Sequence, residues 1–250
     1  MKMKDNIKRI GILGAMDSEV ETLKNTLQDR KELQVAGMTF YYGTLAGFPA
    51  VVAQCGIGKV CAAMGAQAMI DHFTLIGLIN TGVAGGLHRD LEVGDIVLSV
   101  DAIQHDFDVT AFGYPKGYIS GMGPSDRPSR FVADEGLKEI FRAVASSILV
   151  GQKFIEGTIV SGGVFVDNTE LKRELIAQFD ASAAEMEGAA IAQVAHLNHL
   201  PFLVIRAISD LAEKKANVSF DTFVVQAAET SARLVLAMCE RFAQNGDSAL

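Results

Sequence analysis

The chain has 250 residues, of which 49% are hydrophobic and 21% charged, and its formal net charge is −8. This length suits one large domain or two small ones, and the composition is that of a compact folded protein rather than a disordered or fibrous one. The acidic balance disfavours a nucleic-acid partner and an anionic membrane, because both require a basic surface.

Short apolar runs alternate with helix-length patterns along most of the chain. The run RIGILGA at 9–15 predicts a strand, and 18–27 predicts a helix because its apolar residues follow helical spacing. A turn at Gly47 divides 39–56 into two strands. Further strands are predicted at 75–82, 94–100, 154–163 and 201–210, and further helices at 59–73, 133–149, 169–178 and 220–243.

This alternation predicts an α/β fold, with a mostly parallel or mixed sheet covered by helices on both faces. No linker or internal repeat is visible, so residues 1–250 are predicted to form a single domain, with 1–8 as a short N-terminal extension. The segment 112–130 holds three of the five prolines and four glycines, which predicts a long loop with a functional role.

The cysteines and the N-terminal residues bear on location. Cys55, Cys61 and Cys239 form no CxxC pair and are odd in number, so we expect a reducing, cytoplasmic environment. Asp5 and Asn6 stand where a secretion signal needs apolar residues, and no window approaches about 18 consecutive apolar residues. We expect neither a targeting segment nor a membrane span.

Two glycine-rich stretches invite a phosphate-binding interpretation. CGIGKV at 55–60 fails as a phosphate loop, because Ala53 stands at the first glycine position and Val60 replaces the required hydroxyl residue. TGVAGGL at 81–87 is interpreted as a loop after a strand end, which would let a ligand approach the backbone closely; a tight packing turn is the alternative. Open α/β sheets bind ligands at the carboxyl ends of their strands. Predicted strand ends are marked by Gly14, Gly56, Gly82, Gly162 and Asp210.

No metal site is predicted. His196 and His199 lie three apart on a predicted helix, but no third ligand of ordinary spacing accompanies them. Ser161 and Ser209 lack the context of a nucleophilic serine. We therefore expect neither a metal nor any other cofactor.

Three carboxylates remain: Glu19 after the first strand, Glu187 in SAAEMEGAAIAQVAH (182–196), and Asp210 at the last strand's end. If these strand ends meet on one edge of the sheet, the acids converge in one cleft. Cleavage of a glycosidic bond needs such a set, because one group protonates the leaving group while another activates water. The alternatives are that Glu19 is only a first-turn acid and Asp210 only a helix cap.

Seven motifs carry a resemblance that extends from about residue 9 to 243. They are GILGAMDSEV (11–20), GIGKV (56–60), NTGVAGGL (80–87), DVTAFGY (108–114), VSGGVF (160–165), AAEMEGAAIAQVA (183–195) and VIRAISDLA (204–212). In this order they resemble the 5′-methylthioadenosine/S-adenosylhomocysteine nucleosidases of the nucleoside phosphorylase/hydrolase superfamily. The resemblance implies an α/β fold around a mixed, partly barrel-like sheet.

The resemblance also implies roles for individual residues. Glu19 resembles the base that activates water, Asp210 the acid serving adenine N7, Glu187 the carboxylate that holds the ribose hydroxyls, and Arg206 the cation that orients a carboxylate or the water. Glu185 is expected to orient neighbouring groups or to cap a turn. The implied binding set comprises Met186 against the sugar, Phe165 stacked on adenine, the Val166 backbone on the base, Gly85 and Ser209 close to the substrate, and Met16, Ile57 and Phe220 as walls of the sugar and 5′ pocket.

A homodimer is implied as well, because in this family a loop of a second subunit closes the 5′ end of the pocket. Val109 and Phe112 match its apolar positions. Two residues depart from the pattern of some members: Val83 stands in place of a serine near the water, and Ser120 in place of a proline in the partner loop.

The implied reaction is hydrolysis of methylthioadenosine and S-adenosylhomocysteine, and of 5′-deoxyadenosine as a further candidate, to adenine and the thioribose. The alternatives are a purine nucleoside phosphorylase, which needs a cationic phosphate pocket, and a hydrolase of another adenosine-type nucleoside such as a futalosine derivative. A non-catalytic nucleoside-binding protein would need neither Glu19 nor Asp210.

Overall fold

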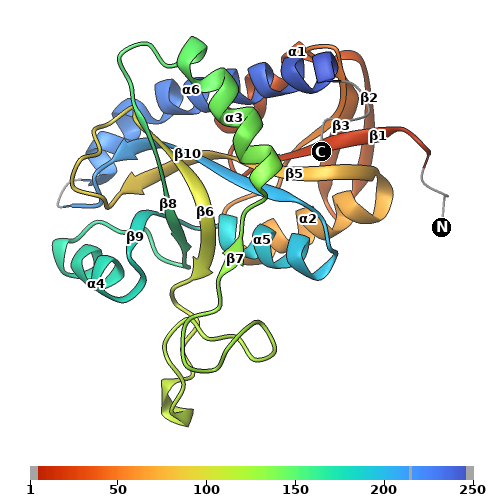
Figure 1. Ribbon diagram of the computed structural model, residues 1–250. Coiled ribbons are helices and arrows are strands. Elements are labelled where there is room, and N and C mark those ends of the chain that lie inside the picture. Colours follow the sequence, from red (N-terminus) through yellow and green to blue (C-terminus); the bar gives the residue numbers. More distant parts are fainter. Residues whose placement is uncertain (1–4, 214–215, 246–250) are drawn as a thin grey trace.

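The computed structural model describes residues 5–213 and 216–245 (Figure 1). The strands are β1 (Lys8–Gly14), β2 (Gln28–Val35), β3 (Met38–Leu45), β4 (Phe48–Gln54), β5 (Thr74–Gly86), β6 (Ile96–Gln104), β7 (Phe131–Val132), β8 (Phe154–Ser161), β9 (Ala181–Glu185) and β10 (Phe202–Asp210). The helices are α1 (Asp17–Thr26), α2 (Lys59–His72), the 3-10 turn η1 (Thr110–Phe112), α3 (Glu135–Ile148), α4 (Thr169–Phe179), α5 (Gly188–Leu197) and α6 (Ala216–Asn245).

The central sheet closes on itself over part of its width. Its strands follow the order β10-β6-β8-β9-β5-β1-β4-β3-β2, and an additional pairing of β10 with β5 closes the first five of them into a ring. The pairs β10–β5 and β6–β8 are parallel, whereas β10–β6 and β5–β9 are antiparallel. The predicted mixed, partly barrel-like sheet within a single α/β domain is therefore confirmed.

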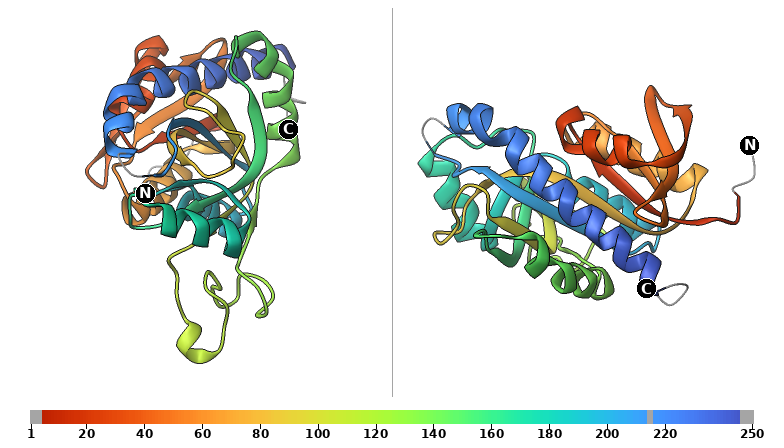
Figure 2. Two further views of the ribbon diagram at one scale, coloured as in Figure 1. Left: turned by 90° about the vertical axis from the view of Figure 1, so that its left-hand side faces the viewer. Right: turned by 90° about the horizontal axis from the view of Figure 1, so that it is seen from above.

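Helices cover the sheet on both sides, and they hold its strands by burial of apolar side chains. The long helix α6 crosses the sheet diagonally (Figure 2) and packs on β10 and β5, with α1 and α3 beside it. On the other side α2 packs against α5, which also contacts β8 and β6. Continuous apolar strands suit this arrangement, because both of their faces are covered. All nine residues of β10 are buried.

One predicted boundary is wrong in an informative way. The stretch 81–87 was expected to leave its strand as a loop, but β5 continues to Gly86 and pairs there with β9. A Cβ atom at Gly82 would lie 2.5 Å from Glu19 Oε1, and one at Gly85 would lie 3.0 Å from Asp210 Oδ1. The glycines are therefore explained by carboxylates approaching the strand rather than by a turn.

Three strands were not predicted, and their sequences explain why. β2 reads QDRKELQV and is mostly exposed, so no apolar alternation marks it. β9 reads ASAAE, in which alanine disfavours a strand assignment. β7 has only two residues.

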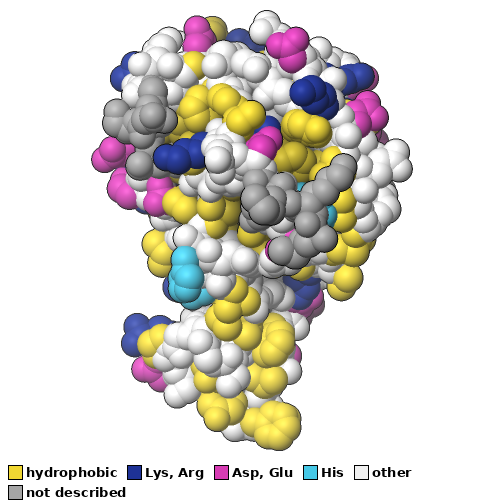
Figure 3. All heavy atoms as spheres, turned by 90° about the vertical axis from the view of Figure 1, so that its right-hand side faces the viewer, with side chains coloured by type: hydrophobic (Ala, Val, Ile, Leu, Met, Phe, Trp, Pro, Cys, Tyr) yellow, Lys and Arg dark blue, Asp and Glu magenta, His cyan; other side chains and the backbone are white. Residues whose placement is uncertain are grey.

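A segment between β6 and β7, residues 105–130, protrudes from the body of the molecule (Figure 1). It contains the predicted long loop and begins seven residues before it. Hydrophobic side chains gather along one side of this protrusion (Figure 3). The side chain of Phe112, in η1, is 80% exposed.

Two remaining expectations concern the ends of the chain and membranes. Of the predicted extension 1–8, residues 1–4 lie outside the described residues, and Lys8 already belongs to β1. Asp5 accepts a hydrogen bond from Arg9 at the start of that strand. Within 5–213 and 216–245, no helix has the length and apolar character that crossing a membrane requires.

Candidate active site

A cavity of about 330 Å³ opens at the strand ends predicted to hold ligands. The ends of β1, β9 and β10, the C-terminal part of β5 and the start of α6 all contribute to its wall. Its lining residues are Ala15, Met16, Glu19, Ile57, Val83, Ala84, Gly85, Phe165, Ala184, Glu185, Met186, Glu187, Ser209, Asp210, Phe220 and Asp221. The three carboxylates Glu19, Glu187 and Asp210, far apart in the sequence, therefore face a single cavity.

Glu19 enters the cavity from the first turn of α1, and backbone N–H groups fix both of its oxygens. Oε2 accepts hydrogen bonds from the N–H groups of Ala15 at 2.7 Å and Met16 at 2.9 Å, and Oε1 accepts one from Val83 at 3.0 Å. The side chain is buried, and this desolvation raises its pKa although Arg206 and the three N–H donors act in the opposite direction. A base whose pKa lies nearer neutrality is suited to proton abstraction.

Asp210 is the last residue of β10. Its Oδ1 accepts a hydrogen bond from the Ala212 N–H at 2.8 Å, and its Oδ2 accepts one from the Ser209 hydroxyl at 3.0 Å. Burial raises the pKa of the carboxyl against these hydrogen bonds. A raised pKa makes an aspartate a better proton donor near neutral pH.

Glu187 is the N-cap residue of α5, but its side chain turns to another element rather than capping its own helix. Its Oε1 accepts a hydrogen bond from the N–H of Gly58, at the start of α2, at 2.6 Å. Burial first and the neighbouring charge of Glu185 second raise its pKa to about 7. The glycine-rich GIGKV motif (56–60) therefore donates a hydrogen bond to a carboxylate of the cavity rather than to a phosphate.

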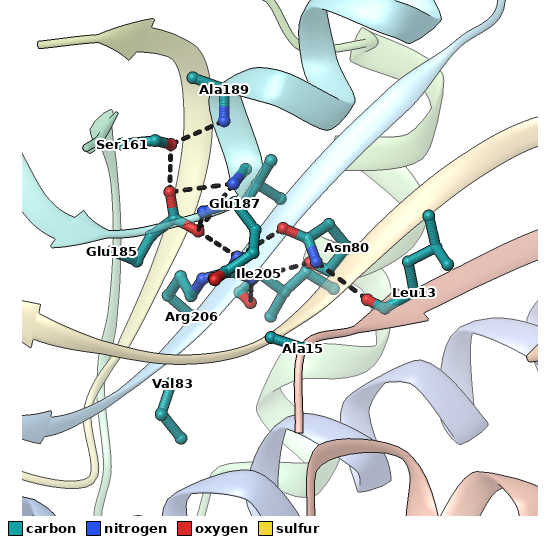
Figure 4. A network of polar contacts seen from close by, with 12 residues as sticks. Leu13, Ala15, Asn80, Val83, Ser161, Glu185, Glu187, Ala189, Ile205 and Arg206 are labelled. Atoms are coloured by element: carbon teal, nitrogen blue, oxygen red, sulfur yellow. Dashed lines mark hydrogen bonds and ion pairs between the residues drawn. The ribbon is translucent and has the colours of Figure 1, made fainter. Parts of the chain in front are cut away.

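Arg206 and Glu185 form a buried ion pair beside the cavity (Figure 4). Arg206 also donates to the Asn80 side chain, and the Asn80 amide donates to the Leu13 carbonyl at 2.9 Å. Glu185 in turn accepts hydrogen bonds from the Glu187 and Gly188 N–H groups at the start of α5. Arg206 does not line the cavity. It acts on Glu187 only indirectly, because it pairs with Glu185, which accepts a hydrogen bond from the Glu187 N–H.

The apolar residues named from the resemblance form the rest of the wall. Phe165 and Phe220 meet edge to face with ring centroids 5.7 Å apart. Met16, Ile57, Met186, Gly85 and Ser209 also line the cavity. Val166 does not line it with its side chain, which is buried in a separate apolar cluster.

The two residues expected to serve a partner subunit stand apart from this chain's own cavity. Val109 and Phe112 lie in the protruding segment and neither lines the cavity. Ser120 is exposed in the same segment. Val83 does line the cavity, and its backbone N–H bonds Glu19, so this contact survives without a serine hydroxyl.

Two parts of the site carried no clear sequence signal. Asn80 is buried and links Arg206 to β1, but it stands in an apolar run that reads only as a strand. Asp221 lines the cavity mouth at the start of α6, where it reads as an ordinary first-turn acid. Glu185 was expected to orient neighbours or cap a turn, and its bonds are of both kinds.

The arrangement places three carboxyl groups, each able to exchange a proton or accept hydrogen bonds, around a cavity of about 330 Å³. Among the residues that the structure describes, no lysine or arginine lines the cavity. In the same ranges, no three His, Cys, Asp or Glu side chains are grouped as a metal site would require, and the His196 ring packs on Phe131. The site is built for acid–base chemistry on a neutral or cationic ligand.

Known proteins share this architecture. A family model described as "Phosphorylase superfamily" matches residues 9–240. The 5′-methylthioadenosine/S-adenosylhomocysteine nucleosidase of Glaesserella parasuis serovar 5 is 42% identical over 236 residues, which are 94% of this chain and 100% of the relative.

Solved structures agree. The 5′-methylthioadenosine/S-adenosylhomocysteine nucleosidase from Neisseria meningitidis, in complex with methylthio-immucillin-A, has a TM-score of 0.88 and 39% identity, covering 94% of this chain and 100% of that one. Futalosine hydrolase of Helicobacter pylori strain 26695 has a TM-score of 0.86 and 34% identity, covering 94% and 98%. The chain belongs to the phosphorylase superfamily and, within it, to the family of 5′-methylthioadenosine/S-adenosylhomocysteine nucleosidases.

Proposed function

We propose that this chain hydrolyses the N-glycosidic bond of 5′-methylthioadenosine and S-adenosylhomocysteine, releasing adenine and the corresponding thioribose. The observation that carries the proposal is the convergence of Glu19, Glu187 and Asp210 on one cavity of about 330 Å³ beside Phe165. The names of the relatives supply the substrate class.

Each carboxylate has a task in this reaction. Protonated Asp210 donates its proton to N7 of adenine, so that the base leaves neutral while the sugar develops oxocarbenium character. Ionised Glu19 accepts a proton from the water that attacks the anomeric carbon. Ionised Glu187 accepts hydrogen bonds from the ribose hydroxyls, with the Met186 thioether packed against the sugar. The overall change adds one water across the bond. Glu19 is then protonated and Asp210 ionised, and proton exchange with solvent restores both.

The ion pair behind the cavity supports this assignment of charges. Arg206 pairs with Glu185, and Glu185 accepts hydrogen bonds from the N–H groups that begin α5, which positions Glu187. The Arg206 Nε–H is buried and has no acceptor among the described residues. Because Arg206 does not line the cavity, we assign it the role of holding Glu185 and, through Glu185, the start of α5 at Glu187.

Hydrolysis is favoured over phosphorolysis by the charge of the lining. A phosphate would meet the Glu19, Glu187 and Asp221 carboxylates with no lysine or arginine on the described wall. The test is adenine release from methylthioadenosine in phosphate-free buffer and in added phosphate. We expect the same rate in both and free thioribose as product. Strict dependence on phosphate, with a ribose 1-phosphate product, would instead identify a phosphorylase.

A second candidate substrate is a futalosine-type nucleoside, because futalosine hydrolase of Helicobacter pylori has the same fold at 34% identity. Met16, Ile57 and Phe220 give the 5′ side an apolar wall, which suits a thioether. We therefore expect kcat/KM to be higher for methylthioadenosine than for a futalosine derivative. The reverse order would change the substrate but keep the reaction.

We also infer that the protein works as a homodimer in the cytoplasm. Phe112 is 80% exposed on a protruding segment, and Ile57 of the cavity wall and Val60, three residues further along the chain, are 59% and 82% exposed. Seating the protruding segment on a second copy would cover both. Sedimentation equilibrium should give twice the chain mass of 26.7 kDa, and a monomer that is fully active would contradict the inference.

A further inference from the structure

Outside the cavity, three segments of the chain meet at one ion pair: the start of α2, the root of the protruding segment and the loop that leads to Phe165. Lys59 follows Gly58, whose N–H bonds Glu187, and its Nζ pairs with the Asp106 carboxylate. Asp106 stands at the root of the protruding segment. Its Oδ2 accepts a hydrogen bond from the Gly163 N–H at 2.8 Å, two residues before Phe165. The pair therefore joins the ribose side of the cavity to its adenine side.

The neighbouring contacts make this junction rigid. Lys59 Nζ also donates to the Gln104 side chain at 3.0 Å, and Gln104 donates to Gln193 of α5 at 2.6 Å. A Cβ atom at Gly162 would lie 2.1 Å from His105 Nε2, so the imidazole rests directly on the backbone there. Only glycine at 162 permits this approach.

We propose that Lys59 and Asp106 are positioning residues for the proposed reaction. Together they fix the loop 162–166, which carries Phe165, relative to Gly58, whose N–H holds the ribose-binding Glu187. The inference rests on the proposed function. Neither residue lines the cavity, so neither is assigned a contact with substrate.

The energetics separate this role from a stabilising one. The side chains of Lys59 and Asp106 are 24% and 32% exposed, and an ion pair of that exposure contributes little to stability. Burial opposes ionisation of Asp106, but the bonds from Lys59 and Gly163 outweigh it and lower its pKa, so the Asp106 carboxylate is ionised at neutral pH. Small displacements of a bound substrate, by contrast, reduce rates steeply.

The test uses the full-length protein with four variants: Lys59→Met, Asp106→Asn, the double variant and Lys59→Arg. Asp106→Asn keeps an oxygen for the Gly163 N–H and loses only the charge pair. The readouts are kcat and KM for methylthioadenosine, the dissociation constant of adenine alone, and the melting temperature.

We expect Lys59→Met and Asp106→Asn each to weaken adenine binding and raise KM by about 5- to 20-fold, within the range that misplacement of a substrate produces. The double variant should lose no more than either single variant, because both remove the same link. Lys59→Arg keeps the charge pair, so its KM and adenine affinity should stay much closer to the wild type than those of Lys59→Met. All melting temperatures should stay within about 2 °C of the wild type.

A matched control is Arg142→Met, which removes an ion pair with Glu156 on the outer face of α3 and β8. It should leave kcat, KM and adenine binding unchanged. Unchanged adenine binding in Lys59→Met and Asp106→Asn, or losses that add up in the double variant, would overturn the proposal. If the wild type itself released no adenine, the proposed function would fail, and adenine binding would still test the pair.

Discussion

The guanidinium of Arg206 donates to the carboxylate of Glu185, and each of these two side chains is 2% exposed. They come from β10 and the end of β9, the two strands that flank β5 in the barrel wall. A buried charge pair is retained at a cost in desolvation, so its presence next to a cavity of carboxylates indicates a functional use. Arg206 is the compensating cation that lets several acids share one site.

Removing one partner of this pair should destabilise the protein strongly. Arg206→Met leaves Glu185 buried without its cation, so we expect the free energy of unfolding to fall by about 3–5 kcal/mol. The double variant Glu185→Gln/Arg206→Met should lose less, because no uncompensated charge remains. Urea unfolding of the three proteins measures this. Equal stability of Arg206→Met and the wild type would show that the pair is not buried in solution.

Asp210→Asn should abolish most turnover while substrate still binds. The amide cannot transfer a proton to adenine N7, and general acid catalysis contributes about 10²- to 10⁴-fold, so kcat should fall by about that factor. The 4-nitrophenyl glycoside of 5-methylthioribose (below, the nitrophenyl thioriboside) has a leaving group that needs no proton. Asp210→Asn should cleave it at nearly the wild-type rate. The exposed Asp90→Asn serves as control, and unchanged turnover of methylthioadenosine by Asp210→Asn would refute the acid role.

Glu19→Gln should lose activity with both kinds of substrate. The amide cannot accept a proton from water, so we expect kcat to fall by about 10²- to 10⁴-fold even when the leaving group is activated. Because Glu19 also accepts three backbone N–H bonds, some loss of stability should accompany the change. Selective rescue by the nitrophenyl thioriboside would assign Glu19 to the leaving group and contradict the assignment.

Glu187 should make stability depend on pH. Its pKa is raised from 4.5 to about 7, so between these values the folded state binds more protons than the unfolded state, and stability falls as the pH rises through this window. The difference in unfolding free energy between Glu187→Gln and the wild type should therefore shift in favour of the variant as the pH rises from 5 to 8, by about 3 kcal/mol at most. Unfolding curves at the two pH values test the sign, and a constant difference would show an ordinary Glu187 pKa.

The same titration should appear in substrate binding. Ionised Glu187 accepts hydrogen bonds from the ribose, so the wild-type KM for methylthioadenosine should decrease as the pH rises through about 7. In Glu187→Gln the KM should be higher and flat over that range.

Phe112 should act on the 5′ end of a partner's cavity. Truncating a buried phenyl ring costs about 1.5–3 kcal/mol, so Phe112→Ala should raise KM for methylthioadenosine by about 10- to 100-fold and leave adenine affinity unchanged. Val150→Ala, a comparably exposed position away from the cavity, should change neither. A loss of adenine affinity in Phe112→Ala would contradict a role confined to the 5′ end.

The sequence predicts the alternating elements and the three facing carboxylates well, because strand ends are marked by glycines and acids. It fails where a residue is chosen for contacts distant in the chain. Gly82 and Gly85 read as a turn, yet they lie within β5 to admit Glu19 and Asp210. β9 is a fully buried strand of the barrel wall and consists mostly of alanine, which carries no strand signal.

The polar framework shows the same limit. Arg206 and Glu185 are 21 positions apart on different strands, and no local spacing reports their contact. Lys59 begins α2, Asp106 follows β6 and Gly163 follows β8, so three separate segments supply these contacts. Only the fold brings these residues together, so no pattern in the sequence predicts their contacts.

A crystal structure of the protein with a non-hydrolysable methylthioadenosine analogue tests the central arrangement most directly. We expect the adenine N7 within hydrogen-bonding distance of Asp210, both ribose hydroxyls on Glu187, and the Glu19 carboxylate within one water molecule of the anomeric carbon. An analogue bound with any of these three carboxylates turned away from it would contradict the account.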